Sequence, residues 1–166
     1  MAEQEVEANP AGGPAERARA VLRLLIQEKH GVLSTHSARE QGWPFGSLTP
    51  YALDAEGQPI FLLSGLAQHT RNVQAEPRAC LFVADSTSRD DPQTGSRTAV
   101  LGRVTPAPEA EQQTLRERYL ARHPSSEPYF ELGDFGLYRM AVEKAHYVGG
   151  FAVAGWVTGG EYRAGR

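Results

Sequence analysis

Residues 46–64 read GSLTPYALDAEGQPIFLLS, and this stretch decides the class of fold. Two apolar runs, 46–53 and 60–64, flank the polar segment 54–59, which contains Gly57. Short apolar runs around a polar turn with glycine are typical of a β-hairpin. Pro50 has no amide donor, so we expect it at a sheet edge, at a bulge, or where the backbone faces a ligand.

The same close spacing of strands continues on both sides of this hairpin. Further strands are predicted at residues 31–36, 78–84, 97–105, 135–142 and 144–148, the last two joined by a turn at Glu143. Residues 78–84 are apolar on both faces, which favours a central strand. Helices are predicted at 15–29, 67–76 and 108–122, and a loop at 125–134. Strands and helices do not alternate regularly, so the sequence favours a mainly β (α+β) antiparallel barrel with helices packed outside.

The two ends of the chain differ in composition from its body. Residues 1–14 are rich in Glu, Ala, Gly and Pro, and residues 158–166 contain three glycines. Such segments bury too little apolar surface to offset the entropy of ordering, so we expect two flexible tails around one domain at residues 15–157. The N-terminus lacks the basic and apolar regions of a signal peptide, and no apolar run is long enough to cross a membrane. We therefore expect a cytoplasmic protein without a membrane partner.

Charge and motif content exclude several function classes. Four of the twenty acidic residues lie in the first sixteen positions, which leaves sixteen acids against seventeen bases in the remainder. A nearly neutral body gives no basic surface for nucleic acid. The single cysteine, Cys80, excludes an internal disulfide framework, and His36, His123 and His146 lack metal-ligand spacing, so no metal site is predicted. Hydrolase-elbow and nucleotide-loop motifs are also missing from the sequence.

Three segments together resemble the pyridoxamine 5'-phosphate oxidase-like FMN-binding split barrels. They are GVLSTH (31–36) followed by PFGSLTP (44–50), then LLSGLAQHTRN (62–72) closed by EPRACLF (76–82), and finally GDFGLYR (133–139) with HYVGGF (146–151). The third segment is most similar to the haem-utilisation branch of that superfamily. The resemblance covers residues 18–157, and it rests on the order and spacing of the segments.

The resemblance implies a six- to seven-stranded antiparallel split barrel, a homodimer, and FMN held between the two subunits. It places the flavin ring along the second strand and the flavin phosphate at the helix that follows the third strand. The cofactor-binding residues implied in this way are Ser47, Leu48, Thr49, Pro50, Ser64, His69, Thr70, Arg71 and Asn72. Trp156 is a further candidate for stacking near the flavin, although a role in the dimer interface is favoured.

The residue types of the predicted phosphate site support this assignment in part. A helix N-terminus near Ala67 offers free amides and a favourable dipole to an anion, and His69, Thr70 and Arg71 add donors. However, family members place an arginine early in the second strand and a lysine in the helix. Here those positions hold Gly46 or Ser47, and His69, so less fixed positive charge is available. Asn72 is favoured as a brace of the helix rather than a ligand.

Three functions remain open at this point. The leading hypothesis is an FMN-dependent oxidoreductase acting on an unidentified small-molecule substrate, with no catalytic acid or base recognisable. The alternative is a haem-binding or haem-degrading protein. Haem iron commonly takes a histidine ligand, and residues 152–166 contain no histidine, which counts against this alternative. The third is a dimeric module that has lost its cofactor.

Overall fold

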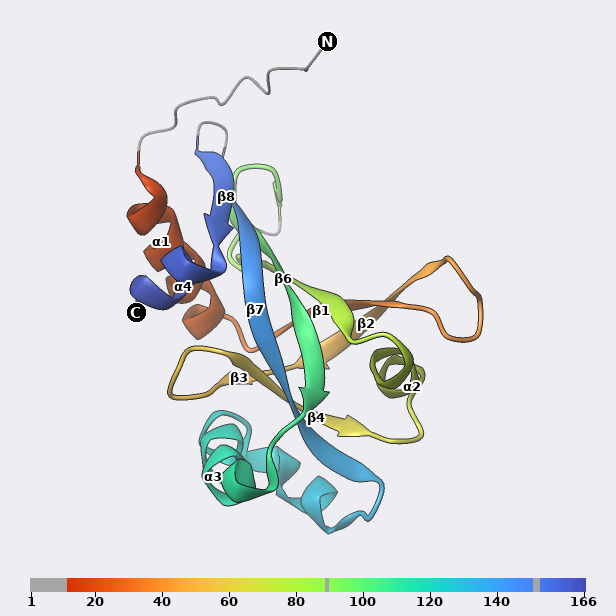
Figure 1. The fold of residues 1–166 in the computed structure, drawn as a ribbon. Helices are drawn as coiled ribbons and strands as arrows, with labels where there is room; N and C mark the ends of the chain where they lie inside the picture. The colour runs from red at the N-terminus through yellow and green to blue at the C-terminus, as the bar shows by residue number, and fades with distance from the viewer. Residues whose placement is uncertain (1–11, 89, 151–152) are drawn as a thin grey trace.

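Eight antiparallel strands form one curled sheet in the computed structural model, which describes residues 12–88, 90–150 and 153–166 (Figure 1). The strand order is β2-β1-β5-β6-β7-β4-β3, and β8 pairs with β7 beside β4. The strands are β1 (His30–His36), β2 (Pro44–Pro50), β3 (Ala52–Leu53), β4 (Pro59–Ser64), β5 (Arg78–Ala84), β6 (Ser96–Pro106), β7 (Phe135–Gly149) and β8 (Ala154–Thr158). This curled antiparallel sheet with flanking helices confirms the predicted split-barrel α+β fold.

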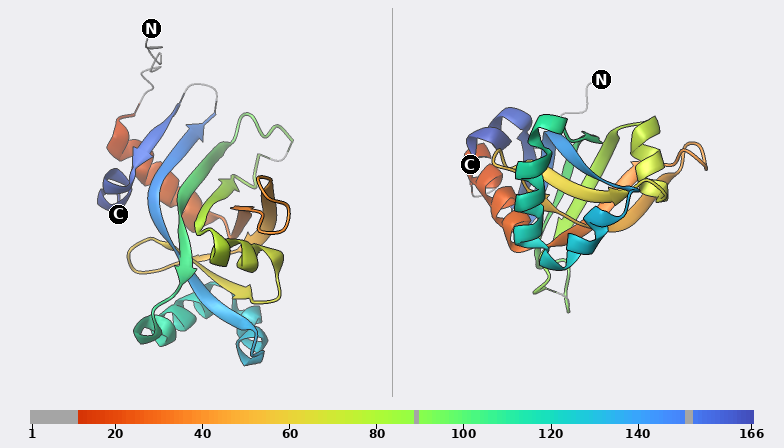
Figure 2. Two further views of the ribbon diagram at one scale, coloured as in Figure 1. Left: turned by 45° about the vertical axis from the view of Figure 1, so that its right-hand side comes forward. Right: turned by 90° about the horizontal axis from the view of Figure 1, so that it is seen from below.

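The helices lie at the margins of the sheet. They are α1 (Pro14–Gln27), α2 (Gln68–Ala75), α3 (Gln112–Arg122) and α4 (Gly159–Ala164), with the 3-10 segments η1 (Glu109–Glu111) and η2 (Pro124–Glu131) on either side of α3. In Figure 2, α1 and α4 lie together against one side of the sheet, and α3 lies near the beginning of β7. The predicted helix over 108–122 is therefore divided, and the predicted loop at 125–134 contains a 3-10 helix.

Two apolar clusters hold these layers together. In the first, the buried stripe of α1, which includes Val21 and Leu25, packs on inward residues of the sheet such as Leu81 and Val100. In the second, Leu115 and Tyr119 of α3 pack against β4 and β7. Because β4 supplies side chains to both clusters, all its residues except the last are buried.

The predicted turn at Glu143 is wrong, because β7 runs unbroken through this position. The register with β6 shifts between Leu101, which faces Lys144, and Gly102, which faces Val142. Glu143 is therefore the extra residue of a β-bulge, which bends a strand without ending it. Gly102 is required at the bulge, since a Cβ there would overlap the carbonyl oxygen of Ala141.

The predicted flexible tail at 158–166 is also wrong, and the folded domain extends past residue 157 into α4. Thr158 and Glu161 form a reciprocal capping box that satisfies free amides at the start of this helix. The ring of Tyr162 is fully buried, and its hydroxyl donates a hydrogen bond to the carbonyl oxygen of Gly57 at 2.5 Å. The burial and hydrogen bond of Tyr162 stabilise the helix more than the three nearby glycines destabilise it. Residues 1–11 of the predicted N-terminal tail lie outside the described residues.

The predicted strand over 46–53 is split at Tyr51. Its ring is fully buried and its hydroxyl donates to the carbonyl oxygen of Leu25 at 2.9 Å, so the backbone turns between β2 and β3. Pro50 lies in β2, an edge strand, which is one of the three positions expected for it. The central position of β5 is confirmed. Among the described residues, no helix is both long enough and apolar enough to cross a membrane.

Candidate functional site

The face of the sheet that points away from α1 carries a row of aligned side chains. Side chains alternate along strands, so residues that are in register across neighbouring strands lie side by side on one face. We call this surface the outer sheet face. Its central row, read across six strands from β2 to β8, is Leu48, Val32, Phe82, Ala99, His146 and Trp156.

The large apolar members of this row are open to solvent. The exposed fractions are 72% for Leu48, 53% for Trp156, 40% for Phe82 and 38% for Val32. Contiguous exposed apolar side chains often mark a surface that binds a partner or a ligand. The outer sheet face is therefore the leading candidate for a functional surface.

His146 is the titratable side chain within the row. Its ring centroid lies 4.9 Å from that of Trp156, in an edge-on arrangement with an interplanar angle of 62°. On its other side lies Ala99, which has a small side chain. The Nζ atom of Lys144, two residues earlier on the same face, is 5.9 Å from the Trp156 ring centroid. One end of the row therefore combines an imidazole, an indole and an ammonium group.

A groove of about 390 Å³ adjoins the row towards the start of β5. Its lining includes His36, Arg78, Cys80, Leu101 and Lys144. Burial raises the pKa of the Cys80 thiol, so at neutral pH it remains protonated and weakly nucleophilic. The lining thus combines charged and polar side chains with the apolar Leu101.

The cations around the groove differ in how they are paired. Arg78 bonds Glu76 at 2.9 Å, and Arg103 bonds Glu143 at the same distance. Within the described ranges, no carboxylate lies within ion-pair distance of Lys144. Lys144 is therefore the cation of this surface best able to meet an acidic group of a ligand.

The four residues predicted on the second strand do not share one face. Leu48 and Pro50 lie on the outer sheet face, whereas Ser47 and Thr49 alternate to the inner face. Thr49 is buried, and its hydroxyl donates to the carbonyl oxygen of Ser47 at 3.2 Å. Trp156 shares the outer sheet face with Leu48 but is five strand steps away, about 24 Å along the sheet. Within one chain, Leu48 and Trp156 therefore lie at opposite ends of the row.

At the predicted phosphate site near the start of α2, Ser64 is bonded to a carboxylate. The Ser64 hydroxyl donates to the carboxylate of Asp134 at 2.5 Å and accepts a hydrogen bond from the Leu66 amide. A second negative charge at this point would be repelled. His69 adds little attraction, because burial lowers its pKa and favours the neutral ring. The carboxylate beside Ser64 therefore counts against a phosphate group at this point.

Asn72 is a structural brace, as the sequence favoured. Its side chain is fully buried, donates to the Thr35 hydroxyl at 2.9 Å, and accepts from the Ala38 amide at 2.9 Å and from Gln68 at 2.8 Å. Thr70 is also fully buried, and its hydroxyl has no hydrogen-bond partner in the described part of the chain. Arg71 points to solvent. The structure thus places Ser64 and the four residues 69–72 together at α2. They lie apart from the outer sheet face.

Sequence reasoning missed most of the outer sheet face. Val32, Phe82, Lys144 and His146 were not among the predicted site residues, and neither Ala99 nor Cys80 was assigned a role. The signal that could have found them is the alternation within the strands at 31–36, 78–84 and 144–148, where one face carries apolar side chains although the other already fills the core. No group of three or more His, Cys, Asp or Glu side chains that could hold a metal ion occurs among the residues that the structure describes.

Comparison with known proteins places this chain in a family. The family profile described as "CREG, beta-barrel" matches residues 13–164. This chain belongs to the CREG beta-barrel family. The match spans both ends of the described domain, including α4, which agrees with the extended domain boundary.

Relatives of this CREG beta-barrel chain include proteins named for haem. A curated relative is 37% identical over 150 residues, the "Non-canonical heme oxygenase HOZ, chloroplastic" of Arabidopsis thaliana, and the match covers 90% of this chain and 44% of the relative. A solved structure titled "heme binding protein from Mycobacterium smegmatis" superposes with a TM-score of 0.82 at 26% identity, covering 92% of this chain and 61% of that one. The chain thus spans less than two thirds of the length of these relatives.

The fold likeness extends to the superfamily that the sequence resembles. A protein of the pyridoxinephosphate oxidase family from Clostridium acetobutylicum superposes with a TM-score of 0.66 at 13% identity, over 87% of this chain and 95% of that one. At such low identity the likeness concerns the fold alone. The fold of the pyridoxamine 5'-phosphate oxidase-like split barrels is confirmed, and the relatives named for haem agree with the resemblance to the haem-utilisation branch.

Proposed function

We propose that this chain binds haem on the outer sheet face and acts in haem breakdown. The observation that carries the proposal is His146, an imidazole set within an apolar row, with Trp156 beside it and Lys144 two residues away. The 37% identical relative named as a heme oxygenase supports the same reading. This was the alternative to an FMN-dependent oxidoreductase, and the carboxylate at the predicted flavin-phosphate site favours it over FMN.

The residue types of the outer sheet face suit the chemistry of haem. Haem is a broad apolar plate with an iron that accepts a histidine nitrogen and with two acidic side groups at one edge. Phe82 and Trp156 would contact the plate, the His146 ring would offer a nitrogen to the iron, and Lys144 would pair with an acidic group. As a substrate, bound haem supplies the iron at which O₂ chemistry on its own ring can begin.

We also propose that a second copy of this chain covers the outer sheet face. A plate lying on an open sheet leaves one side in water, and oxidative chemistry is protected when water is excluded. In a two-fold dimer each subunit presents the same surface to the other. The Leu48 end of one row can then lie over the Trp156 end of the partner's row, which would enclose haem between two subunits and bring together groups that are about 24 Å apart along one sheet.

Titration of the purified protein with haemin, followed by absorption spectroscopy, tests the haem site. We expect a sharp Soret band in the wild type, at least a tenfold loss of affinity in His146→Ala, and recovery of the band when imidazole is added to that variant. His69→Ala is the matched control, because His69 lies at α2, away from the outer sheet face. Equal affinity in His146→Ala and wild type, or a loss confined to His69→Ala, would exclude the assignment.

Two further readouts separate the remaining functions. Haem bound as a substrate should lose its Soret band under O₂ with ascorbate as reductant, and a stable band would limit the function to haem binding. Absorption after addition of FMN tests the flavin hypothesis, and a protein that retains FMN through gel filtration would restore it. A protein that responds to neither ligand would be the cofactor-free module.

Light scattering tests the second copy. We expect a dimer mass for the wild type and a monomer mass for Leu48→Glu, since that substitution places two carboxylates in the interface. Haemin affinity should fall in the same variant, because each site would lose its cover. A monomeric wild type that binds haemin tightly would contradict the shared site but not the haem site itself.

A further inference from the structure

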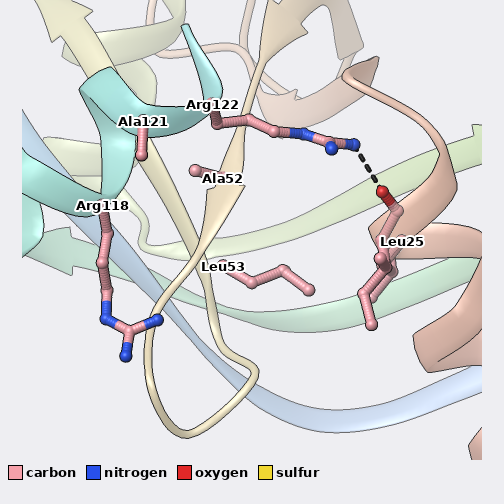
Figure 3. A pocket seen from close by; sticks show the side chains of 7 residues that line it. Leu25, Ala52, Leu53, Arg118, Ala121 and Arg122 are labelled. Carbon is pink, nitrogen blue, oxygen red and sulfur yellow. Dashed lines mark hydrogen bonds between the residues drawn. The ribbon is translucent and has the colours of Figure 1, made fainter.

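A second cavity lies away from the outer sheet face, between α1, β3 and α3, with a volume of about 310 Å³ (Figure 3). Its floor is apolar, formed by Leu25, Ala52 and Leu53, and Ala121 lies on its α3 side. Leu25 and Ala52 are nearly fully buried, so the floor is a continuation of the protein core. At its α1 rim Ile26 is 60% exposed, which is unusual for a large aliphatic side chain.

Two arginines of α3 border this apolar floor, and they are engaged differently. Arg122 reaches across to α1, where it donates to the carbonyl oxygens of Ile26 and Glu28 at 2.5 and 2.8 Å. Arg118 stands on the other side of the cavity, and only Arg122 reaches α1 in Figure 3. In the portion of the chain that the structure covers, Arg118 has neither an ion pair nor a hydrogen bond through its side chain. Its guanidinium keeps all five donors for a ligand.

The rim of the cavity is positively charged, because Arg118 and Arg122 both line it. The nearby carboxylate of Glu28 is buried and already accepts hydrogen bonds from the Ser86 amide and from Gln27. The cavity therefore combines an apolar floor with a cationic rim. An uncharged apolar molecule would leave the Arg118 guanidinium without a hydrogen-bond partner.

We propose that this cavity binds a small amphipathic carboxylate, with its hydrocarbon chain on Leu25, Ile26 and Leu53 and its carboxylate on Arg118. Guanidinium and carboxylate groups form charge-assisted hydrogen bonds in matched pairs, which explains why an arginine at this rim selects a carboxylate. A volume of about 310 Å³ is at the lower end for ligand pockets. At about 30 Å³ for each water-sized group it holds about ten heavy atoms. An eight-carbon fatty acid, with ten heavy atoms, matches that size.

Isothermal titration of the full chain with octanoate tests this site. We expect saturable one-to-one binding by the wild type and at least tenfold weaker binding by Arg118→Gln. Arg116→Gln is the matched control on the same helix, because Arg116 pairs with Glu131 and lies over the Phe130 ring rather than in the cavity. Ala121→Trp, at an exposed helix position, should fill the cavity and abolish binding while the thermal unfolding of the protein stays cooperative.

Two probes divide the contributions of charge and apolar surface. 1-Octanol should bind at least tenfold more weakly than octanoate, and inorganic phosphate should not compete with octanoate. Competition by phosphate, equal binding of octanoate by Arg118→Gln and wild type, or no binding by the wild type would each overturn the proposal. Haemin titration should be unchanged in Arg118→Gln, so the outcome is independent of the proposed haem site.

Discussion

Replacing Asn72 by alanine should destabilise the protein strongly and leave any cofactor chemistry unaffected. The buried amide joins α2 to the end of β1 and to the loop after it, through one hydrogen bond to Thr35 and two accepted from Ala38 and Gln68. Each such bond contributes about 1 kcal/mol, and the buried Thr35 hydroxyl would lose the donor that Asn72 provides. The three losses together predict about 3 kcal/mol, a large share of the 5–15 kcal/mol that holds most domains folded.

Urea unfolding followed by circular dichroism measures this loss. With a slope of about 2 kcal/mol per molar urea, a loss of about 3 kcal/mol shifts the midpoint down by about 1.5 M. Arg71→Ala, the exposed neighbour, is the control and should change the unfolding free energy by less than about 0.5 kcal/mol. If Asn72→Ala unfolds like wild type but fails to retain FMN, then Asn72 is a ligand and the brace assignment is incorrect.

Three further predictions follow from single contacts. Tyr162→Phe should cost about 1 kcal/mol of unfolding free energy, because the carbonyl of Gly57 loses its buried donor, and Tyr162→Ala about 4 kcal/mol; thermal melts of both variants would show whether α4 is part of the cooperative unit. The hydrogen bonds from Arg78 lower the pKa of Glu76 from 4.5 to about 2 in the folded state. The stabilising effect of Glu76 is therefore present above pH 4.5 and is lost as the pH falls towards 2. Glu76→Gln should flatten that part of a stability–pH curve, and an unchanged slope would mean that the pair does not persist in solution. Cys80 should react slowly with iodoacetamide at pH 7 and faster as the pH rises, since burial raises its pKa, and haemin should slow the reaction further; rapid labelling in the presence of haemin would argue that the outer sheet face stays open.

The strands could be predicted because their apolar patterns are local. Residues 78–84 alternate and begin directly after Pro77, so the start of β5 follows from the sequence. The edge position of β2 was one of the three positions that Pro50 left open. The bulge at Glu143 could not be predicted, because a charged residue inside a strand gives the same signal as a turn. Only the pairing with β6, at Leu101 and Gly102, distinguishes the two.

The C-terminal helix was missed for a related reason. Glycines at 159, 160 and 165 lower the local tendency to form a helix, and the tertiary contact of Tyr162 with the 54–59 turn overrides it. That contact joins residues 105 positions apart, which no pattern in a short window can show.

The predicted site depended on the resemblance more than on the residues. The resemblance placed a phosphate at α2, and the decisive fact against it, the Asp134 carboxylate on Ser64, comes from a residue 70 positions away. The outer sheet face, in contrast, was available from strand alternation alone. His146 was considered only for metal-ligand spacing to other histidines, whereas its importance arises from neighbours on β6 and β8.

The pairing of β4 has a consequence for the synthesis of the chain. Apart from the two-residue β3, its sheet partner is β7, which begins about seventy residues later. During translation β1 can pair with β2, and β5 with β6, before β7 has been synthesised. Until then β4 remains unpaired along most of its length, and it is apolar on both faces. Such segments are prone to aggregate before their partner arrives. Substitutions that slow the formation of β7, including those at the Glu143 bulge, should therefore reduce soluble yield in cells more than they reduce the stability of the folded protein.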